Sequence, residues 1–257
     1  MACWSEIPPA RENCCIRCGE DLFEAAATSA AAANLCRPCR MAPPAFIRAV
    51  SFGVYEGSMR AVIHALKYSR MAPLARELGS RLASAIAQFA PQAESDSHRE
   101  MLVVPVPLHR SRMTERGFNQ SRTLATEALR ILRRTHPEWR LELSSRSLVR
   151  QRSTESQAGL TPRQRRLNLR GAFFVSDSEA LRGRHILLVD DIYTTGATAR
   201  ACSKILIEAG AASVRVATLA RAQRRVPLQI RDDRKYKRLS NPADAAGPDQ
   251  SNAVTVH

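Results

Sequence analysis

The stretch Ile186–Thr198, ILLVDDIYTTGAT, decides the fold class of this chain. It begins with a run of aliphatic residues, which is typical of a strand whose two faces are both covered. Helical sequence follows as far as Ala209, where Gly210 predicts the helix end, and Ser213–Leu219 has the composition of a further strand. A strand, a loop, a helix and a strand in this order indicate the α/β class, with a parallel sheet and helices on both of its faces.

The loop inside this stretch has the features of a sugar-phosphate site. Asp190 and Asp191 come at the carboxyl end of the strand, where ligands bind in parallel sheets, and carboxylates accept hydrogen bonds from ribose hydroxyls. The unpaired amides at the start of a helix favour a phosphate, and a glycine lets the backbone approach it. The residues expected around the phosphate are Thr194, Thr195, Gly196, Ala197 and Thr198. Taken singly, the acidic pair is also compatible with a solvated loop, and Thr-Thr-Gly with a plain turn.

A second phosphate-binding segment is predicted on a neighbouring strand. Leu102–Val106 has the composition of a buried strand, and the segment after it, as far as Gly117, is expected to be a loop rich in arginine. Guanidinium groups suit phosphate oxygens because they donate two parallel hydrogen bonds, and a glycine lets backbone amides contribute. Arg116 and Gly117 are therefore candidate ligands, with a solvated surface turn as the alternative. Lys67, in a chain with few lysines, either reaches a phosphate or is a solvated lysine at a helix end.

The N-terminal part of the chain contains six of its seven cysteines. Two Cys-x-x-Cys pairs, separated by 17 residues, predict a tetrahedral zinc site, although a redox motif or plain reduced thiols are alternatives. Because a module of about 45 residues lacks the core to fold unaided, we expect the zinc to be structural and residues 1–45 to form a zinc-ribbon module. The predicted ligands are Cys15, Cys18, Cys36 and Cys39, with Cys14 competing for the first position.

Basic residues are concentrated in the middle of the chain. The net charge is +15, and 35 of the 39 basic residues are arginines. Between His109 and Arg170 there are 15 arginines and five glutamates, which favours an anionic partner, either a phosphorylated small molecule or a nucleic acid. A GC-rich genome also produces an arginine-rich composition. No apolar run is long enough for a bilayer and the N-terminus lacks a signal-peptide pattern, so we expect no membrane insertion and a cytoplasmic protein.

The remaining elements follow from periodicity and from turn residues. We expect a strand at 49–55, helices at 58–68 and 73–89, a loop at 92–100, a helix at 119–133, a strand at 142–148 and an extended stretch at 172–175. Residues 46–222 then form one domain, and the basic, aperiodic residues 223–257 form a disordered tail.

Several motifs together resemble the type I phosphoribosyltransferases. The stretch 186–198 is similar to their ribose-5-phosphate motif, and Arg116-Gly117-Phe118 is similar to their diphosphate loop. Further motifs narrow the resemblance to the ComF family, which is linked to competence for DNA uptake. These motifs are VPVPLH at 104–109, ERGFNQS at 115–121, YEG at 55–57, ALKY at 65–68, Gln157, Arg163, Asn168, GAF at 171–173 and the cysteine pairs; together they cover roughly residues 10–222.

The resemblance implies the type I phosphoribosyltransferase fold, with phosphoribosyl diphosphate as the ligand. By this resemblance Asp190 and Asp191 hold the ribose hydroxyls and are the candidate catalytic residues, residues 194–198 wrap the 5-phosphate, and Mg²⁺ accompanies the diphosphate. Residues 149–170 correspond to a flexible loop that closes over the diphosphate to exclude water. The candidates for contacts from that loop are Arg150, Arg152 and Gln157.

Two functional classes remain open. The first is an enzyme of the glycosyltransferase class, a phosphoribosyltransferase with an unknown acceptor. Amination from glutamine is not expected, because Ala2 precedes Cys3 and no catalytic cysteine follows Met1. The second is a non-catalytic factor that binds a nucleotide or single-stranded DNA in natural transformation, with competence proteins as further partners. An aromatic content of 5% argues against a surface built for base stacking.

Overall fold

The computed structural model of the protein describes most of the chain up to Gln223. The described residues are 13–22, 34–69, 72–90, 100–152, 164, 169 and 171–223. Several sequence expectations fall outside them: the loop at 92–99, most of the closing loop at 149–170 including Gln157, and the tail from residue 224 onward.

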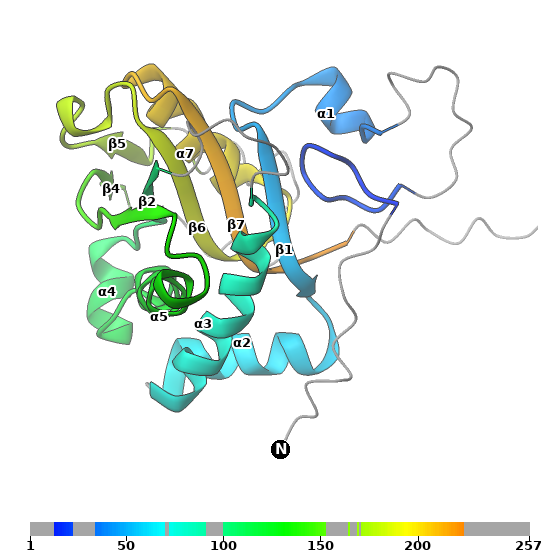
Figure 1. The fold of residues 1–257 in the computed structure, drawn as a ribbon, viewed down its shortest axis with the longest axis vertical. Helices are drawn as coiled ribbons and strands as arrows, with labels where there is room; N and C mark the ends of the chain where they lie inside the picture. Colours follow the sequence, from blue (N-terminus) through cyan, green and yellow to red (C-terminus); the bar gives the residue numbers. More distant parts are fainter. Residues whose placement is uncertain are drawn as a thin grey trace, which may run out of the picture. The chain divides into compact units, whose positions relative to one another are not determined.

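Five strands form a sheet in the order β1-β7-β6-β2-β3 (Figure 1). Their bounds are β1 Arg48–Val54, β2 Glu100–Pro105, β3 Arg140–Leu143, β6 His185–Tyr193 and β7 Ser213–Arg221. Every neighbouring pair in this sheet is parallel. β6 lies in the middle, and its aliphatic run is buried on both faces, as a central strand of a covered parallel sheet requires. The predicted α/β class is confirmed.

Alternate residues of the strands face two separate apolar layers. Along β6, Leu187 and Val189 belong to one layer, and Ile186 and Leu188 belong to the other. The first layer is completed by α2 (Gly57–Ser69), α3 (Ala72–Ala87) and α5 (Gln120–Thr135), and the second by α7 (Ala197–Glu208). The predicted helices on both faces of the sheet are therefore present.

Smaller elements surround the sheet. They are α1 (Arg37–Met41), which together with its N-cap residue carries the second cysteine pair, α4 (Arg110–Arg116), a 3-10 helix (Glu179–Leu181), and the strands β4 (Leu148–Arg150) and β5 (Phe173–Val175). β4 and β5 pair with each other in antiparallel fashion, and they pack on the α7 side through buried Leu148 and Phe173. Among the helices that the structure describes, none is long and apolar enough to cross a membrane.

Three expectations about secondary structure are wrong in detail. The strand expected at 142–148 is interrupted: β3 ends at Leu143, and β4 begins at Leu148 in a different sheet. The arginine-rich loop is largely the helix α4, because nothing in its sequence breaks a helix before Gly117, which ends it with φ 74°. β6 continues past its aliphatic run to Tyr193, since β7 is long enough to pair with it throughout.

Candidate functional site

The two segments predicted to bind phosphate follow adjacent strands of the sheet, at the point where the strand order reverses. β2 and β6 are neighbours, and the Val106 amide donates to the Val189 carbonyl at 2.8 Å just beyond their last paired residues. From β2 the chain passes through α5 to β3 on one side, and from β6 it passes through α7 to β7 on the other. Ligands of parallel sheets bind at the carboxyl ends of strands at such a switch point. The expectation that the second segment follows a neighbouring strand is confirmed.

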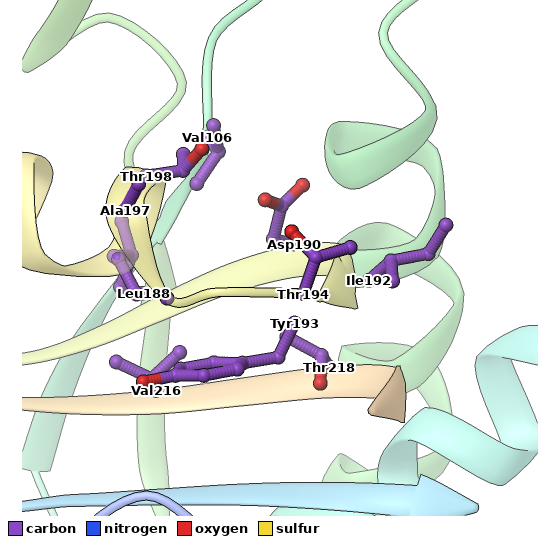
Figure 2. Close-up of a pocket in the computed structure, with 12 residues that line it drawn as sticks. Val106, Leu188, Asp190, Ile192, Tyr193, Thr194, Ala197, Thr198, Val216 and Thr218 are labelled. Atoms are coloured by element: carbon purple, nitrogen blue, oxygen red, sulfur yellow. The ribbon is translucent and has the colours of Figure 1, made fainter. Parts of the chain in front are cut away.

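A pocket lies at this switch point, between the end of β6 and the start of α7. Its lining includes Val106 after β2, Asp190 of β6, Thr194 and Thr198 of the loop, and Thr218 of β7. Figure 2 shows the Asp190 carboxylate and Thr198 on the same side of β6, with the Tyr193 ring and Thr218 on the other side. The structure therefore places one carboxylate beside the amino terminus of a three-turn helix, where backbone amides favour an anion.

Gly196 shapes this loop, since it is the N-cap of α7 and adopts φ 74°, ψ 9°. A side chain at this position would place its Cβ 2.2 Å from the hydroxyl oxygen of Tyr193. The ring of Tyr193 fills the space beneath the loop, and the Thr195 hydroxyl accepts from the amide of Ala197 at 3.4 Å. The glycine expected to let a ligand approach the backbone is thus also required by the protein's own packing.

The two acidic residues occupy consecutive strand positions, and consecutive side chains of a strand point to opposite faces. Asp190 is partly buried and accepts two hydrogen bonds, from the Ser121 hydroxyl at 3.0 Å and from the Asp191 amide at 2.9 Å. Asp191 is 5% exposed, and its Oδ2 lies 2.8 Å from the Nζ of Lys67. The pair is therefore divided: Asp190 faces the pocket, whereas Asp191 holds the end of α2.

Lys67 was expected either near a phosphate or in solvent. In the structure its ammonium group forms an ion pair with Asp191. Burial of its ammonium group favours the neutral form, but the charge and hydrogen bond of Asp191, with a smaller effect from Asp190, outweigh this and raise the pKa of Lys67. Burial, together with the charge of Asp191, raises the pKa of Asp190 to about 8, although the Ser121 hydroxyl and Lys67 act in the opposite direction. A bound cation or a ribose diol would favour the ionised form of this carboxyl.

The raised pKa of Asp190 leads to a testable pH dependence. A carboxyl that binds its proton more tightly in the folded state contributes stability below its unfolded value of 3.8, and this contribution is lost as the pH rises towards 8. Asp190→Asn should therefore raise the melting temperature at pH 8 by about 3 °C or more, and the gain should shrink towards pH 4. Thermal unfolding followed by circular dichroism from pH 4 to 9 measures this difference. A gain that is the same at every pH would contradict the pKa assignment, and the exposed Asp177, replaced by Asn, is the control.

The arginine-rich segment is joined to the same site by hydrogen bonds. Asn119 caps α5 by accepting from the amides of Ser121 at 2.9 Å and Arg122 at 3.3 Å, and its Nδ2 donates to the Val106 carbonyl at 3.0 Å. Gly117 is exposed, and its amide closes α4 by donating to Met113 at 2.7 Å. The Gly117 amide is thus used within α4, and Arg116 lies in the last turn of the same helix; their role as phosphate ligands stays a prediction.

Two residues near the site were missed or undervalued in the sequence. In the sequence Ser121 is only the last residue of the motif ERGFNQS, yet its hydroxyl donates the hydrogen bond that links α5 to Asp190. Arg150 of β4 was only one of several candidates in a loop. Burial lowers its pKa, while the nearby Cys202 and Asp190 raise it and Arg112 lowers it, so this guanidinium shares the electrostatic environment of the site. The start of α5 and the end of β6 are distant in the sequence, so no local pattern of residues indicates that they are in contact.

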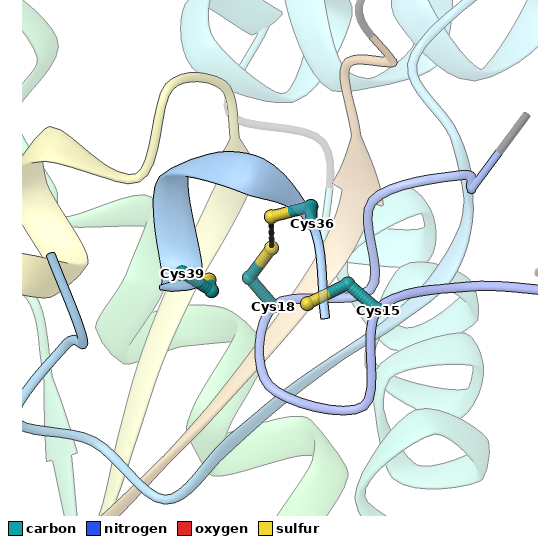
Figure 3. Close-up of side chains that lie close together, drawn as sticks. All are labelled: Cys15, Cys18, Cys36 and Cys39. Carbon is teal, nitrogen blue, oxygen red and sulfur yellow. Dashed lines mark hydrogen bonds between the residues drawn. The ribbon is translucent and has the colours of Figure 1, made fainter. Parts of the chain in front are cut away.

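The four predicted zinc ligands form one cluster (Figure 3). Cys15, Cys18, Cys36 and Cys39 are all buried, and their sulfur atoms lie within 4.8 Å of one another. The sulfur atoms of Cys18 and Cys36 are 3.6 Å apart. Four sulfurs at about 2.3 Å from a tetrahedral zinc ion are roughly 3.8 Å from each other, so the donor set fits this metal. Cys14, the competing candidate, lies outside the cluster.

Known proteins resemble this chain over most of its length. The model of the family described as "Phosphoribosyl transferase domain" matches residues 119–249. DNA utilization protein YhgH of Escherichia coli K12 is 33% identical over 72% of this chain and 77% of its own. Competence protein F of Haemophilus influenzae is 29% identical over 74% of this chain and 80% of its own, and competence protein ComFC of Bacillus subtilis is 31% identical over 65% and 62%.

Among solved structures, a glutamine phosphoribosylpyrophosphate amidotransferase from B. subtilis complexed with ADP and GMP is 22% identical, with a TM-score of 0.30. It matches 55% of this chain and 25% of that protein. The parallel sheet, the helices on its two faces and the family match together establish a phosphoribosyltransferase fold preceded by a four-cysteine module. The chain therefore belongs to the ComF family, whose members carry a phosphoribosyltransferase domain.

Proposed function

We propose that the protein binds phosphoribosyl diphosphate at the switch point between β2 and β6, and that it transfers the phosphoribosyl group to an acceptor. The observation that carries the proposal is the position of Asp190 beside the amino terminus of α7. A ribose 5-phosphate presents a diol and a phosphate at a fixed separation, and this end of β6 offers a carboxylate and helix amides side by side. Residues 194–198 would hold the phosphate, and Asp190 would accept from a ribose hydroxyl.

Two arginines, in α4 and β4, are the candidates for binding the diphosphate. Arg116 at the end of α4 and Arg150 of β4 would neutralise negative charge that builds up on the leaving diphosphate. Mg²⁺ fits a site of this kind, because it binds through one or two carboxylates together with substrate phosphates. When bound, the ion would stabilise the leaving group. Lys67 keeps Asp191 paired and thereby leaves Asp190 as the carboxylate available to the ligand.

A second function is favoured by the relatives, which are named as DNA utilization and competence proteins. A non-catalytic protein could use the same anion site for a nucleotide or for a phosphate of single-stranded DNA. Exposed arginines at 110, 130, 133 and 134 on α4 and α5 would add salt-dependent attraction.

Ligand-induced thermal stabilisation tests the proposal. Phosphoribosyl diphosphate with Mg²⁺ at 100 times its dissociation constant should stabilise the wild-type protein by about 2.7 kcal/mol. Asp190→Asn should lose most of this shift, because the amide cannot replace a charged acceptor. Asp177→Asn is the matched control, since the exposed Asp177 side chain accepts from the Ala180 amide and asparagine can do the same.

Phosphorus NMR of the same mixtures separates transfer from binding, because it reports free diphosphate as it is released. If phosphoribosyl diphosphate gave equal melting shifts in Asp190→Asn and Asp177→Asn, or no melting shift in the wild type, its binding at this site would be ruled out. Tight, salt-dependent binding of single-stranded DNA in their place would favour the second function.

A further inference from the structure

The cysteine cluster is attached to the end of β7 by a buried arginine. Arg221 is 4% exposed, although it is the last residue of the strand. Its Nη2 lies 3.7 Å from the sulfur of Cys18 and pairs with the carboxylate of Glu20. Its guanidinium group lies over the ring of Tyr193, 4.4 Å from the ring centre. A buried guanidinium needs such partners, because unpaired burial of a charge is costly.

Tyr193 connects this arginine to residues 194–198, which are called the phosphate loop below. It is the last residue of β6, directly before the loop, and only 4% of it is exposed. One side of the ring receives Arg221, and its hydroxyl end fills the space under Gly196. Phe46, which follows the cysteine segment, packs edge-on against the same ring at 6.3 Å. A shift of Arg221 would therefore move the support of the loop.

A second arginine makes the same connection on the other flank of the loop. Arg200 lies in the first turns of α7, where its amide donates to the Gly196 carbonyl at 2.9 Å. Its Nη2 lies 3.7 Å from the sulfur of Cys39, and its Nη1 donates to the Ala42 carbonyl at 2.6 Å. The loop is thus held between two residues, Tyr193 and Arg200, that both depend on the cysteine segment.

The charge of the cluster gives these contacts their strength. A divalent cation with four thiolates carries two negative charges, and two guanidinium groups directed at its sulfurs offset them. If the metal is lost, the four sulfur atoms are no longer held in fixed positions, and Arg200 and Arg221 lose the acceptors at which they are directed. Arg221 would keep its ion pair with Glu20 and Arg200 its hydrogen bond to the Ala42 carbonyl, but both would lose the sulfur contact that fixes the guanidinium group against the cluster.

We propose that Arg200 and Arg221 are positioning residues through which a metal-filled cysteine cluster fixes the phosphate loop. Metal occupancy then controls the affinity of the loop for a phosphate. By linkage, a bound phosphate raises the affinity of the cluster for its metal by the same free energy. The effect on ligand affinity rests on the proposed function, whereas the effect on loop conformation does not. The cysteine module thus acts as a support of the binding site as well as a folding unit.

Hydrogen exchange of the full-length, zinc-loaded protein tests the coupling. In Arg200→Met, the amides of residues 194–198 should exchange at least about tenfold faster than in the wild type, while those of β2 and β6 stay unchanged. Lys204→Met is the matched control, because this lysine lies one turn further along α7 with 71% of its side chain exposed and forms an ion pair with Glu208. Arg221→Met should act in the same direction, but it is buried and serves only as a second variant.

Metal release gives an independent readout. Transfer of zinc to a chromogenic chelator should be slower in the presence of inorganic phosphate for the wild type, and phosphate should have no such effect on Arg200→Met. Loop exchange in Arg200→Met equal to that of the Lys204→Met control would overturn the proposal. Faster loop exchange in a protein that binds neither phosphate nor phosphoribosyl diphosphate would uphold the support role and reject the proposed function instead.

Discussion

Gly196→Ala is expected to reduce the affinity for a ribose phosphate by at least about 100-fold. Two costs add at this position. An L-residue at φ 74° is strained by about 1–2 kcal/mol, and the new Cβ would lie 2.2 Å from the Tyr193 hydroxyl and 2.5 Å from the ring carbon that bears it. The loop or the ring must move, and the amides of the loop then lose their common direction. Isothermal titration with ribose 5-phosphate measures the loss.

The matched control separates backbone strain from the clash. Gly183 adopts φ 70°, nearly the same conformation, and a Cβ there would have no atom within 4 Å. Gly183→Ala should therefore lower stability by the strain alone and leave ligand affinity unchanged. Adding Tyr193→Phe to Gly196→Ala should restore only part of the affinity, because the ring carbon remains too close. Wild-type affinity in Gly196→Ala would show that the loop does not form the phosphate site.

Cys36→Ser is expected to have the largest effect on the protein as a whole. Its sulfur is buried in the cluster, and a serine hydroxyl is a poor ligand for zinc beside three thiolates. With the metal lost, the cysteine module has little core of its own, and Arg200 and Arg221 lose their sulfur contacts. The free energy of unfolding should fall by on the order of 3–5 kcal/mol.

Elemental analysis and chemical denaturation together check this expectation. Zinc content should fall from about one ion per chain to a small fraction of that in Cys36→Ser. Cys14→Ser is the control, since Cys14 lies in the same segment, half-buried, but outside the cluster. A Cys36→Ser protein that keeps both its metal and its stability would show that the cluster does not bind zinc through four thiolates.

The sequence predicts those parts of the fold that depend on neighbouring residues. The aliphatic run before Asp190 identifies β6 because a central strand must be apolar on both faces. The end of that strand could not be placed, since its length depends on pairing with β7. The helix α4 was missed for a related reason: arginine-rich sequence is typical of both solvated loops and exposed helices, and only Gly117 marks its end.

The residues of the candidate site were predicted better than their partners. Spacing alone indicated the four cysteines and the loop around Gly196. The ion pair between Lys67 and Asp191 joins a helix end to a strand that follows it by more than a hundred residues, and local periodicity contains no trace of it. The same holds for the hydrogen bond from Ser121 to Asp190. Such contacts depend on the order of strands in the sheet.

The contacts between Glu20 and Arg221 and between Asp21 and Gln223 affect how the protein is made. These residues are separated by 201 and 202 positions, so the first part of the chain completes its contacts only with the last described strand. At roughly 5–20 residues per second, a ribosome needs about 10–40 s to cover that distance. During this interval the four thiols have left the ribosome without the arginine that covers them. Zinc bound during translation would protect these thiols from oxidation until β7 has been made.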